Sequence, residues 1–180
     1  MLKIEDSILV IIDEQEKLIN ASDSSENIVI NTAKLARACE ILSIPVIVTE
    51  QYPQGLGETA DVIKNNLPEG AAFVEKTSFS AVNEADFAKK VSSLRRRQVL
   101  LCGIETHICV LQTALGFMEK GFDVYILRDC CSSRHRNEHE TGIELLRQYG
   151  AGIICTEIAL FDWIKTSKHP NFKEIQALIK

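Results

Sequence analysis

Three residues with functional groups suited to nucleophilic catalysis each follow an apolar run: Asp13, Lys76 and Cys109. The free N–H groups and partial positive charge of a helix start stabilise a thiol as thiolate, so Cys109 is the candidate nucleophile. A carboxylate can accept the thiol proton and later return it to a leaving amine, and an ammonium favours the thiolate and steadies the carboxylate. Backbone N–H groups near residues 105 and 109 could hold the oxyanion of a tetrahedral intermediate.

The pattern of apolar residues predicts how these groups come together. Six short apolar runs alternate with stretches of helical periodicity, as in a parallel sheet covered by helices. The carboxyl ends of parallel strands meet at one edge, where ligands bind in open α/β sheets. The sequence therefore predicts a single domain over residues 1–180, with an α/β, doubly wound, Rossmann-like, six-stranded parallel sheet. The expected strands are 7–13, 44–49, 72–75, 98–102, 122–127 and 152–155, and the expected helices are 26–42, 83–94, 106–120, 136–149, 157–164 and 171–179.

Two expected loops leave this edge of the sheet, at residues 50–57 and 128–134. The first contains a proline and two glycines, and a long loop in this position commonly covers a site. Tyr52, Phe79 and Thr106 are the candidate substrate-binding residues, because they would flank Cys109 if the loops fold over it. Phe79 has the alternative of being a core residue.

Each member of the set also has an ordinary structural explanation. A cysteine in the first turn of a helix is commonly packed core, a lysine after a strand is commonly a surface residue, and Asp13 could cap the following turn. Equivalent positions at three strand ends favour chemistry over these alternatives.

Composition excludes some functions. The 180 residues carry a net charge of -5, which repels nucleic acid and anionic membrane surfaces. The basic cluster at 95–97 reads as a solvated turn. The first residues lack the pattern of a signal peptide, and no apolar run has the length of a membrane span. We therefore expect a cytoplasmic protein with reduced thiols, a small-molecule substrate, and neither nucleic-acid nor membrane partners.

Several other polar residues have structural interpretations. His135 and His139 have the spacing of a helical metal pair but lack a third ligand in register, which favours a solvated helix face. Cys130 and Cys131 read as structural thiols. Arg134 is expected to make a structural or subunit contact in preference to a substrate contact. The spacing of two residues directs His107 away from Cys109.

The motifs around the three chemical residues resemble those of a known family. Val-Ile-Ile-Asp13-Glu-Gln-Glu-Lys, Glu-Lys76-Thr-Ser-Phe-Ser and Gly103-Ile-Glu-Thr-His-Ile-Cys109-Val together resemble the isochorismatase-like cysteine hydrolases. The segments 49–57, 131–134 and 169–180 are most similar to the subgroup of isochorismatase domain-containing proteins. The resemblance covers nearly the whole chain and implies the isochorismatase-like hydrolase fold.

The resemblance also implies roles for individual residues. It implies a triad of Asp13 as proton shuttle, Lys76 as support for the thiolate and transition state, and Cys109 as nucleophile. It implies a cis peptide bond between Ile104 and Glu105, with the N–H groups of Glu105 and Cys109 forming an oxyanion hole. A homo-oligomer of undefined size is implied as well.

Departures from relatives narrow the expected chemistry. Nicotinamidases of this family hold a metal through an Asp-x-His pair and a further His after the second strand, whereas residues 50–57 here contain neither His nor Asp. We therefore expect no metal and no cofactor, and discount nicotinamide as substrate. True isochorismatases lack the nucleophilic cysteine, so Cys109 disfavours vinyl-ether hydrolysis and favours attack on an amide-like carbon.

The leading hypothesis is a metal-independent cysteine hydrolase that cleaves a C–N bond through a Cys109 thioester. A binding or scaffold protein that retains the fold is the alternative, and a ribonuclease is a third. A depressed pKa of Cys109 is expected for the hydrolase, and an ordinary thiol pKa for the scaffold.

Overall fold

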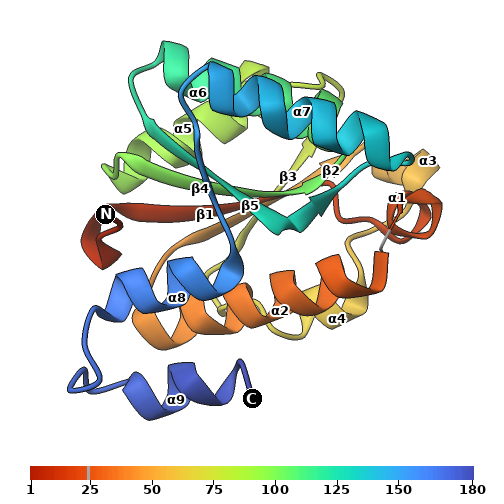
Figure 1. Cartoon of the computed structure of the whole chain (residues 1–180). Coiled ribbons are helices and arrows are strands. Elements are labelled where there is room, and N and C mark those ends of the chain that lie inside the picture. Colours follow the sequence, from red (N-terminus) through yellow and green to blue (C-terminus); the bar gives the residue numbers. More distant parts are fainter. Residues whose placement is uncertain (24) are drawn as a thin grey trace.

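A six-stranded sheet lies between two layers of helices in the computed structural model, which describes residues 1–23 and 25–180 (Figure 1). Every strand pair is parallel, and the order is β3-β2-β1-β4-β5-β6. This confirms the predicted fold class. The chain starts at the centre and builds outward in both directions, so the topological switch point, where such sheets bind ligands, lies between β1 and β4. The strands are β1 (Ser7–Ile12), β2 (Val46–Gln51), β3 (Ala72–Lys76), β4 (Gln98–Ile104), β5 (Asp123–Ser132) and β6 (Gly152–Ile154).

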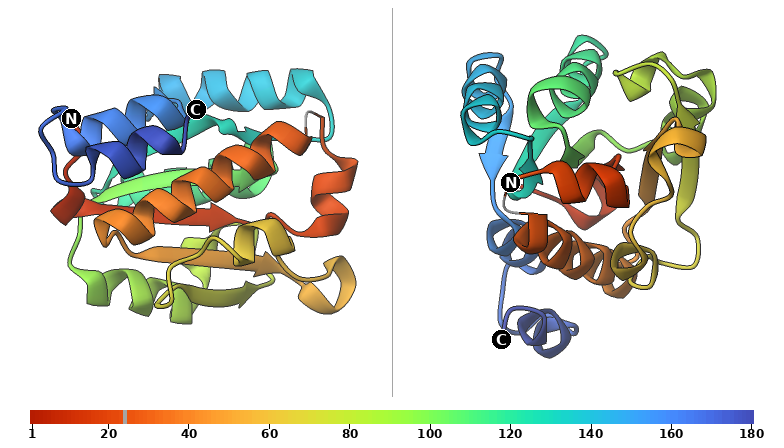
Figure 2. Two further views of the ribbon diagram at one scale, coloured as in Figure 1. Left: turned by 90° about the horizontal axis from the view of Figure 1, so that it is seen from below. Right: turned by 90° about the vertical axis from the view of Figure 1, so that its right-hand side faces the viewer.

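Helices cover both faces of the sheet. Figures 1 and 2 show α5, α6 and α7 on one face and α2, α4 and α8 on the other, with α9 outside α2. The short helices α1 and α3 lie at the carboxyl edge (Figure 1). The α-helices are α1 (Glu16–Ala21), α2 (Ser25–Leu42), α3 (Pro53–Leu56), α4 (Asp61–Lys64), α5 (Ala85–Leu94), α6 (Leu111–Glu119), α7 (Arg136–Gln148), α8 (Thr156–Ile164) and α9 (Phe172–Ala177). The 3-10 turns are η1 (Ile4–Asp6) and η2 (Ala81–Asn83), and η3 (Thr106–Val110) is a π-helical turn.

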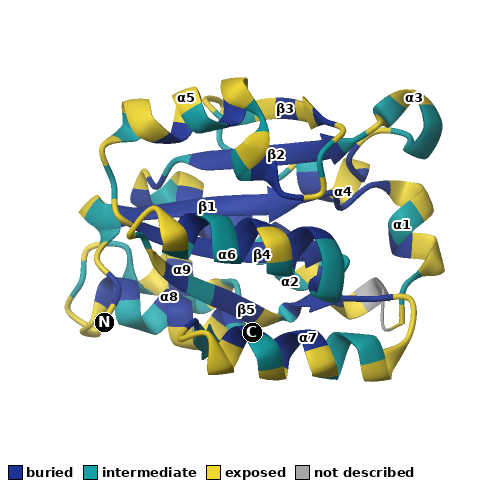
Figure 3. Cartoon of the chain, turned by 90° about the horizontal axis from the view of Figure 1, so that it is seen from above, coloured by how far each residue is buried: buried dark blue, intermediate teal, exposed yellow. Residues whose placement is uncertain are grey.

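The core is centred on β1 and β4, in which every residue is buried (Figure 3). Each of these strands has a partner on both sides and helices on both faces, which explains why their sequences are continuously apolar. Aromatic contacts join α5 and α6. Phe117 of α6 packs edge-on against Phe87 of α5 and against Phe122, with ring centroids 5.8 and 5.1 Å apart. Burial of each such side chain contributes about 1.5–3 kcal/mol. The carboxyl edge is thus built on a rigid centre.

Four segments differ from the prediction, and one of them is the helix α1, where no element was expected. The fifth strand continues to Ser132, so most of the expected loop at 128–134 is strand. In the expected loop at 50–57, Glu50 and Gln51 belong to β2, and Pro53–Leu56 form α3, where proline occupies the first turn. The expected helix at 106–120 begins with the π-helical turn, and regular α-helix starts at Leu111. Polar residues at the ends of β2 and β5, and the proline at the start of α3, made these segments resemble loops in the sequence.

Within the described part of the chain, no helix combines the length and apolar character needed to span a membrane.

Candidate active site

The structure brings Asp13, Lys76 and Cys109 together at the carboxyl edge. Asp13 follows β1 with a positive φ of 51°, Lys76 is the last residue of β3, and Cys109 lies in the turn η3 after β4. All three are buried, with 0 %, 2 % and 8 % of their surface exposed. Strand ends from the centre and one side of the sheet therefore supply a carboxylate, an ammonium and a thiol to one point.

Asp13 and Lys76 form a buried ion pair. The Asp13 Oδ2 to Lys76 Nζ distance is 2.7 Å, and neither side chain is exposed. Thr49 of β2 donates its hydroxyl to Asp13 Oδ1 at 2.7 Å. Burial raises the pKa of Asp13, while Lys76 and the Thr49 hydrogen bond oppose this increase. The result is a carboxylate with a greater tendency to accept a proton than a solvated aspartate has.

The Lys76 ammonium is fixed by further acceptors. Gln51 Oε1 accepts a hydrogen bond from Nζ at 2.6 Å, and the carbonyl oxygens of Ser78 and Phe79 lie at 3.2 and 3.3 Å. Gln51 stands opposite Lys76 in the β2–β3 register. The buried Gln15 holds Gln51 in turn, because its side chain bonds both the N–H and the C=O of that residue.

Sequence reasoning missed Gln51 and Gln15 as parts of this site. Gln51 fell within an expected loop, and register between strands cannot be read from one strand. A usable signal was its place among the polar residues that directly follow the apolar run 46–48, a position similar to that of Asp13 after its own run.

Cys109 lies beside this ion pair, close enough for the charges of Asp13 and Lys76 to act on its sulfur. Burial, followed by the negative charge of Asp13, raises the pKa of Cys109 to about 12, against the lowering effect of Lys76. The expectation of a thiolate stabilised by a helix start is therefore wrong for the resting protein. Loss of hydration at a largely buried sulfur outweighs the favourable charges.

A tight backbone turn presents the predicted oxyanion donors. Gly103 has a φ of +124°, and a β-carbon there would overlap the Ile12 carbonyl of the neighbouring strand. The cis peptide bond implied by the family resemblance is present between Ile104 and Glu105. The Glu105 carbonyl accepts the N–H groups of Ile108 and Val110, which starts η3. The roles of the Glu105 and Cys109 N–H groups remain predictions.

The Glu105 side chain binds Arg134. Its Oε1 accepts hydrogen bonds from the Arg134 N–H at 3.0 Å and Nε at 2.9 Å. The contact of Arg134 is thus structural, one of the two contacts expected for it.

The three predicted substrate-binding residues have different environments. Tyr52 and Phe79 are more than half exposed, at 57 % and 55 %, so both rings are accessible to a ligand. Thr106 is fully buried, and its hydroxyl donates to the Ser132 carbonyl at 3.0 Å and contacts His139 Nδ1 at 2.8 Å. Its hydroxyl therefore serves the contact between η3, β5 and α7.

Histidines and other cysteines lie outside the triad. His107 Nδ1 contacts Ser133 Oγ at 2.9 Å and Nε2 lies 3.7 Å from Glu138 Oε2, so both ring nitrogens face residues outside the triad. His135 is exposed as predicted, whereas His139 is partly buried against Thr106, so the solvated face predicted for both histidines is wrong for His139. Cys130 and Cys131 are buried free thiols.

One group of side chains could hold a cation. Ligand atoms of Glu105, His107 and Glu138 lie within 4.8 Å of one another, on the side of η3 that faces α7. The Glu105 carboxylate already binds Arg134, so a cation would compete with that ion pair. This group is separate from the buried triad.

A parallel α/β sheet with a buried aspartate, lysine and cysteine at its carboxyl edge is a hydrolase-like arrangement, and comparisons with known proteins identify the family. Residues 7–158 match the model of the isochorismatase domain. The chain is 40% identical over 178 residues to isochorismatase domain-containing protein 2 of Danio rerio, covering 99% of this chain and 89% of the relative. The chain belongs to the isochorismatase family, and its similarity to this subgroup is confirmed.

Two solved structures show how closely the fold is shared. A structure of MAR1 ribonuclease from Caenorhabditis elegans is similar with a TM-score of 0.95 and 35% identity, covering 99% of this chain and 91% of that chain. The YcaC gene product of Escherichia coli, described as an octameric hydrolase of unknown specificity, is similar with a TM-score of 0.88, covering 98% of this chain and 94% of that chain. At 20% identity the second likeness concerns the fold alone.

Proposed function

We propose that this chain is a metal-independent cysteine hydrolase that cleaves the C–N bond of a small amide-like substrate through a thioester on Cys109. The position of the buried Cys109 beside the Asp13–Lys76 ion pair carries the proposal. A nucleophile, a proton acceptor and a fixed cation at one point are the groups that acyl transfer requires. A buried ion pair is weak evidence for fold stability, because the desolvation of both charges costs free energy.

The geometry supports a mechanism in two halves. Asp13 takes the Cys109 proton as sulfur attacks the carbonyl carbon, and the N–H groups of Glu105 and Cys109 stabilise the oxyanion. The C–N bond breaks, the amine leaves with the proton from Asp13, and a thioester remains. Water then attacks the thioester while Asp13 accepts a water proton. The C–S bond breaks, the acid leaves, and the proton returns from Asp13 to sulfur.

Lys76 supports this proton transfer at both stages. Its ammonium contacts Asp13 and lies beside the sulfur, so it stabilises whichever of the two carries negative charge. The expectation that no metal takes part rests on the sequence of residues 50–57, which contains no histidine or aspartate.

The proposal is tested by screening amides, ureides and carbamates while recording the intact mass of the protein. We expect an acyl adduct on Cys109 in the wild type, and no turnover in Cys109→Ala or Cys109→Ser. Cys155→Ser is the matched control, because this partly exposed thiol directly precedes α8, after the edge strand β6. Full turnover by Cys109→Ala would exclude the mechanism.

Ribonuclease activity is a second candidate, favoured by the similarity of this chain to the Caenorhabditis elegans MAR1 ribonuclease. The net charge of -5 opposes RNA binding. RNA cleavage that persists in Cys109→Ala would not belong to this site. A scaffold protein remains the outcome if no substrate yields an adduct or turnover.

We further propose a homo-oligomer in a reducing, cytoplasmic compartment, acting on a small molecule, with neither nucleic acid nor membrane as partner. The octameric description of the Escherichia coli relative supports assembly, and six unpaired cysteines suit a reducing environment. Light scattering after size exclusion tests the assembly, and a monomer at micromolar concentration would exclude it.

A further inference from the structure

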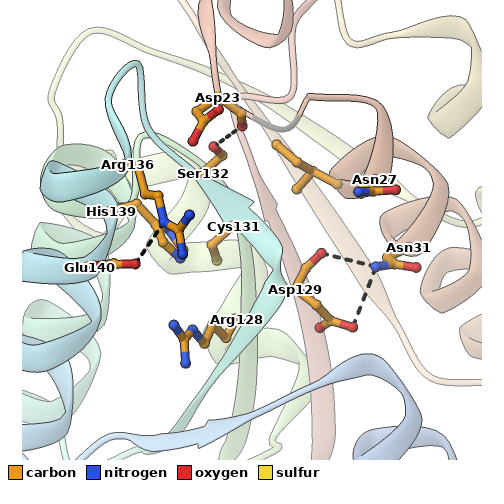
Figure 4. Close-up of a pocket in the computed structure, with 11 residues that line it drawn as sticks. Asp23, Asn27, Asn31, Arg128, Asp129, Cys131, Ser132, Arg136, His139 and Glu140 are labelled. Carbon is orange, nitrogen blue, oxygen red and sulfur yellow. Dashed lines mark hydrogen bonds and ion pairs between the residues drawn. The ribbon is translucent and has the colours of Figure 1, made fainter.

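A polar cavity of about 460 Å³ lies beside β5 at the carboxyl edge, separate from the predicted triad (Figure 4). Its walls come from the start of α2, the second half of β5 and the first turns of α7. The side chains lining it are Asp23, Asn27, Ile28, Asn31, Arg128, Asp129, Cys131, Ser132, Arg136, His139 and Glu140.

The cavity forms because β5 is longer than the neighbouring strands β4 and β6. The last pair between β5 and β6 is Leu127 with Ile154, so the outer edge of β5 beyond it has no strand partner within the described residues. On the inner edge the register shifts, because Leu101 faces Ile126 but Gly103 faces Cys131. The extra residues of β5 bulge between the two helix layers, and bulges of this kind redirect side chains near functional sites.

The acidic groups of the cavity are largely engaged. Asp129 accepts the Thr156 N–H at the start of α8 at 2.9 Å and 3.1 Å, one distance to each oxygen. Glu140 Oε1 accepts a hydrogen bond from Arg136 Nε at 3.0 Å. Asp23 lies at the rim beside Ser132, whose hydroxyl donates to the Asp23 carbonyl (Figure 4).

The cationic side of the cavity retains free donors. Arg136 uses Nε for Glu140, which leaves its terminal nitrogens, and Arg128 makes no ion pair with any residue that the structure describes. Figure 4 shows Arg128, Arg136 and His139 on one side of the cavity, with Asn31 and Asp129 opposite. Guanidinium groups in this setting match the planar geometry of a carboxylate.

His139 connects this wall to the candidate active site. The Thr106 hydroxyl has one proton, which goes to the Ser132 carbonyl, so His139 Nδ1 must donate to Thr106. Nε2 therefore carries an acceptor lone pair when the ring is neutral, and it becomes a hydrogen-bond donor when the ring is protonated. Thr106 directly follows Glu105, whose N–H is the predicted oxyanion donor.

We propose that this cavity binds a small polar carboxylic acid, with the carboxylate on Arg128, Arg136 and protonated His139, and its polar remainder toward Asn31. A singly charged carboxylate is favoured over a doubly charged phosphate, because Asp129 and Glu140 stay in the walls. Any effect of this ligand on turnover rests on the proposed function, whereas its binding does not.

Binding is coupled to the protonation of His139. Burial, Arg128 and Arg136 lower the pKa of the free imidazole, while Glu140 and Asp23 raise it. A bound carboxylate offsets the arginine charges and accepts a hydrogen bond from Nε2, which raises the pKa. Affinity therefore increases as pH falls through the pKa of the ligand-bound imidazole, and it stops increasing below the pKa of the free imidazole.

The test follows the His139 ring by NMR during titration with sodium glycolate, with sodium phosphate as the second arm and sodium chloride at equal ionic strength as reference. The His139→Gln variant assigns the signal among four histidines. We expect a saturable glycolate-dependent rise in the His139 pKa. Arg128→Gln should weaken glycolate binding by roughly tenfold or more. Arg147→Gln, at the exposed end of α7, should have no effect.

Each outcome decides the proposal. Saturation by glycolate in the wild type and in Arg147→Gln, with loss in Arg128→Gln, supports it. Absence of saturation, equal binding by Arg128→Gln, or tighter binding of phosphate than of glycolate overturns it. None of these results depends on turnover at Cys109.

Discussion

Glu14 makes protein stability depend on pH in a direction opposite to that of most carboxylates. The residue follows Asp13 and is fully buried. Thr32 donates its hydroxyl to Oε1 at 2.7 Å, and Oε2 has no hydrogen-bond partner among the described residues. Burial raises the pKa of Glu14 from 4.5 to about 8, against hydrogen bonds from Thr32 and Cys102. The carboxyl group is therefore neutral in the folded protein at neutral pH.

The sign of the effect follows from proton linkage. Above pH 4.5 the unfolded chain loses this proton, whereas the folded chain keeps it until about pH 8. The folded state thus binds more protons in this window, and its stability falls as pH rises. At 1.36 kcal/mol per pH unit, the window from 4.5 to about 8 corresponds to an upper limit of roughly 5 kcal/mol.

Glu14→Gln removes this dependence, because the amide resembles the neutral carboxyl group and its oxygen can still accept the Thr32 hydrogen bond. We expect the variant to gain stability over the wild type progressively from about pH 5 to 8, by a few kcal/mol at the upper end. Urea unfolding under reducing conditions at several pH values measures the difference. Glu16→Gln, on the exposed surface of α1, is the control. A constant difference across this range would show that Glu14 ionises normally and refute the reasoning.

Three further substitutions probe the site. Lys76→Met leaves the Asp13 charge buried and should cost about 3–5 kcal/mol in urea unfolding, part of which Asp13→Asn in the double variant should restore. Gly103→Ala should destabilise by about 3 kcal/mol or more through its overlap with Ile12, measured by thermal melting, whereas Gly150→Ala should cost only about 1 kcal/mol. Asp13→Asn alone should abolish adduct formation by an amide-like substrate, measured by intact mass, because no base then takes the thiol proton.

The fold was predictable because its central strands are buried on both faces. The continuous apolar runs of β1 and β4 reflect burial directly, so their positions were correct to within two residues. The second half of β5 was missed, since Arg128 and Asp129 occupy an edge that faces a polar cavity. A strand loses its apolar signature wherever one edge or face meets water.

The candidate site was predictable in its residue types but not in its electrostatics. Parallel topology alone requires side chains after different strands to meet at one edge, which is why Asp13, Lys76 and Cys109 could be grouped from the sequence. The raised pKa of Cys109 depends on how completely the sulfur is buried, and this is a property of packing. The His139–Thr106 contact likewise joins elements whose relative position the sequence does not specify.

The raised pKa of Cys109 changes what its reactivity can reveal. In the absence of substrate the proton stays on sulfur, because burial disfavours the thiolate. The positive charge of Lys76 is also already paired with the Asp13 carboxylate. Asp13 can take the proton only when negative charge moves from sulfur to a carbonyl oxygen held by backbone N–H groups. Deprotonation of Cys109 thus requires a bound substrate whose carbonyl oxygen can take up the negative charge. Simple alkylating reagents provide no such oxygen and encounter a protonated thiol. Slow alkylation at neutral pH is therefore expected for the hydrolase as well as for a scaffold, and only an adduct that requires Asp13 separates them.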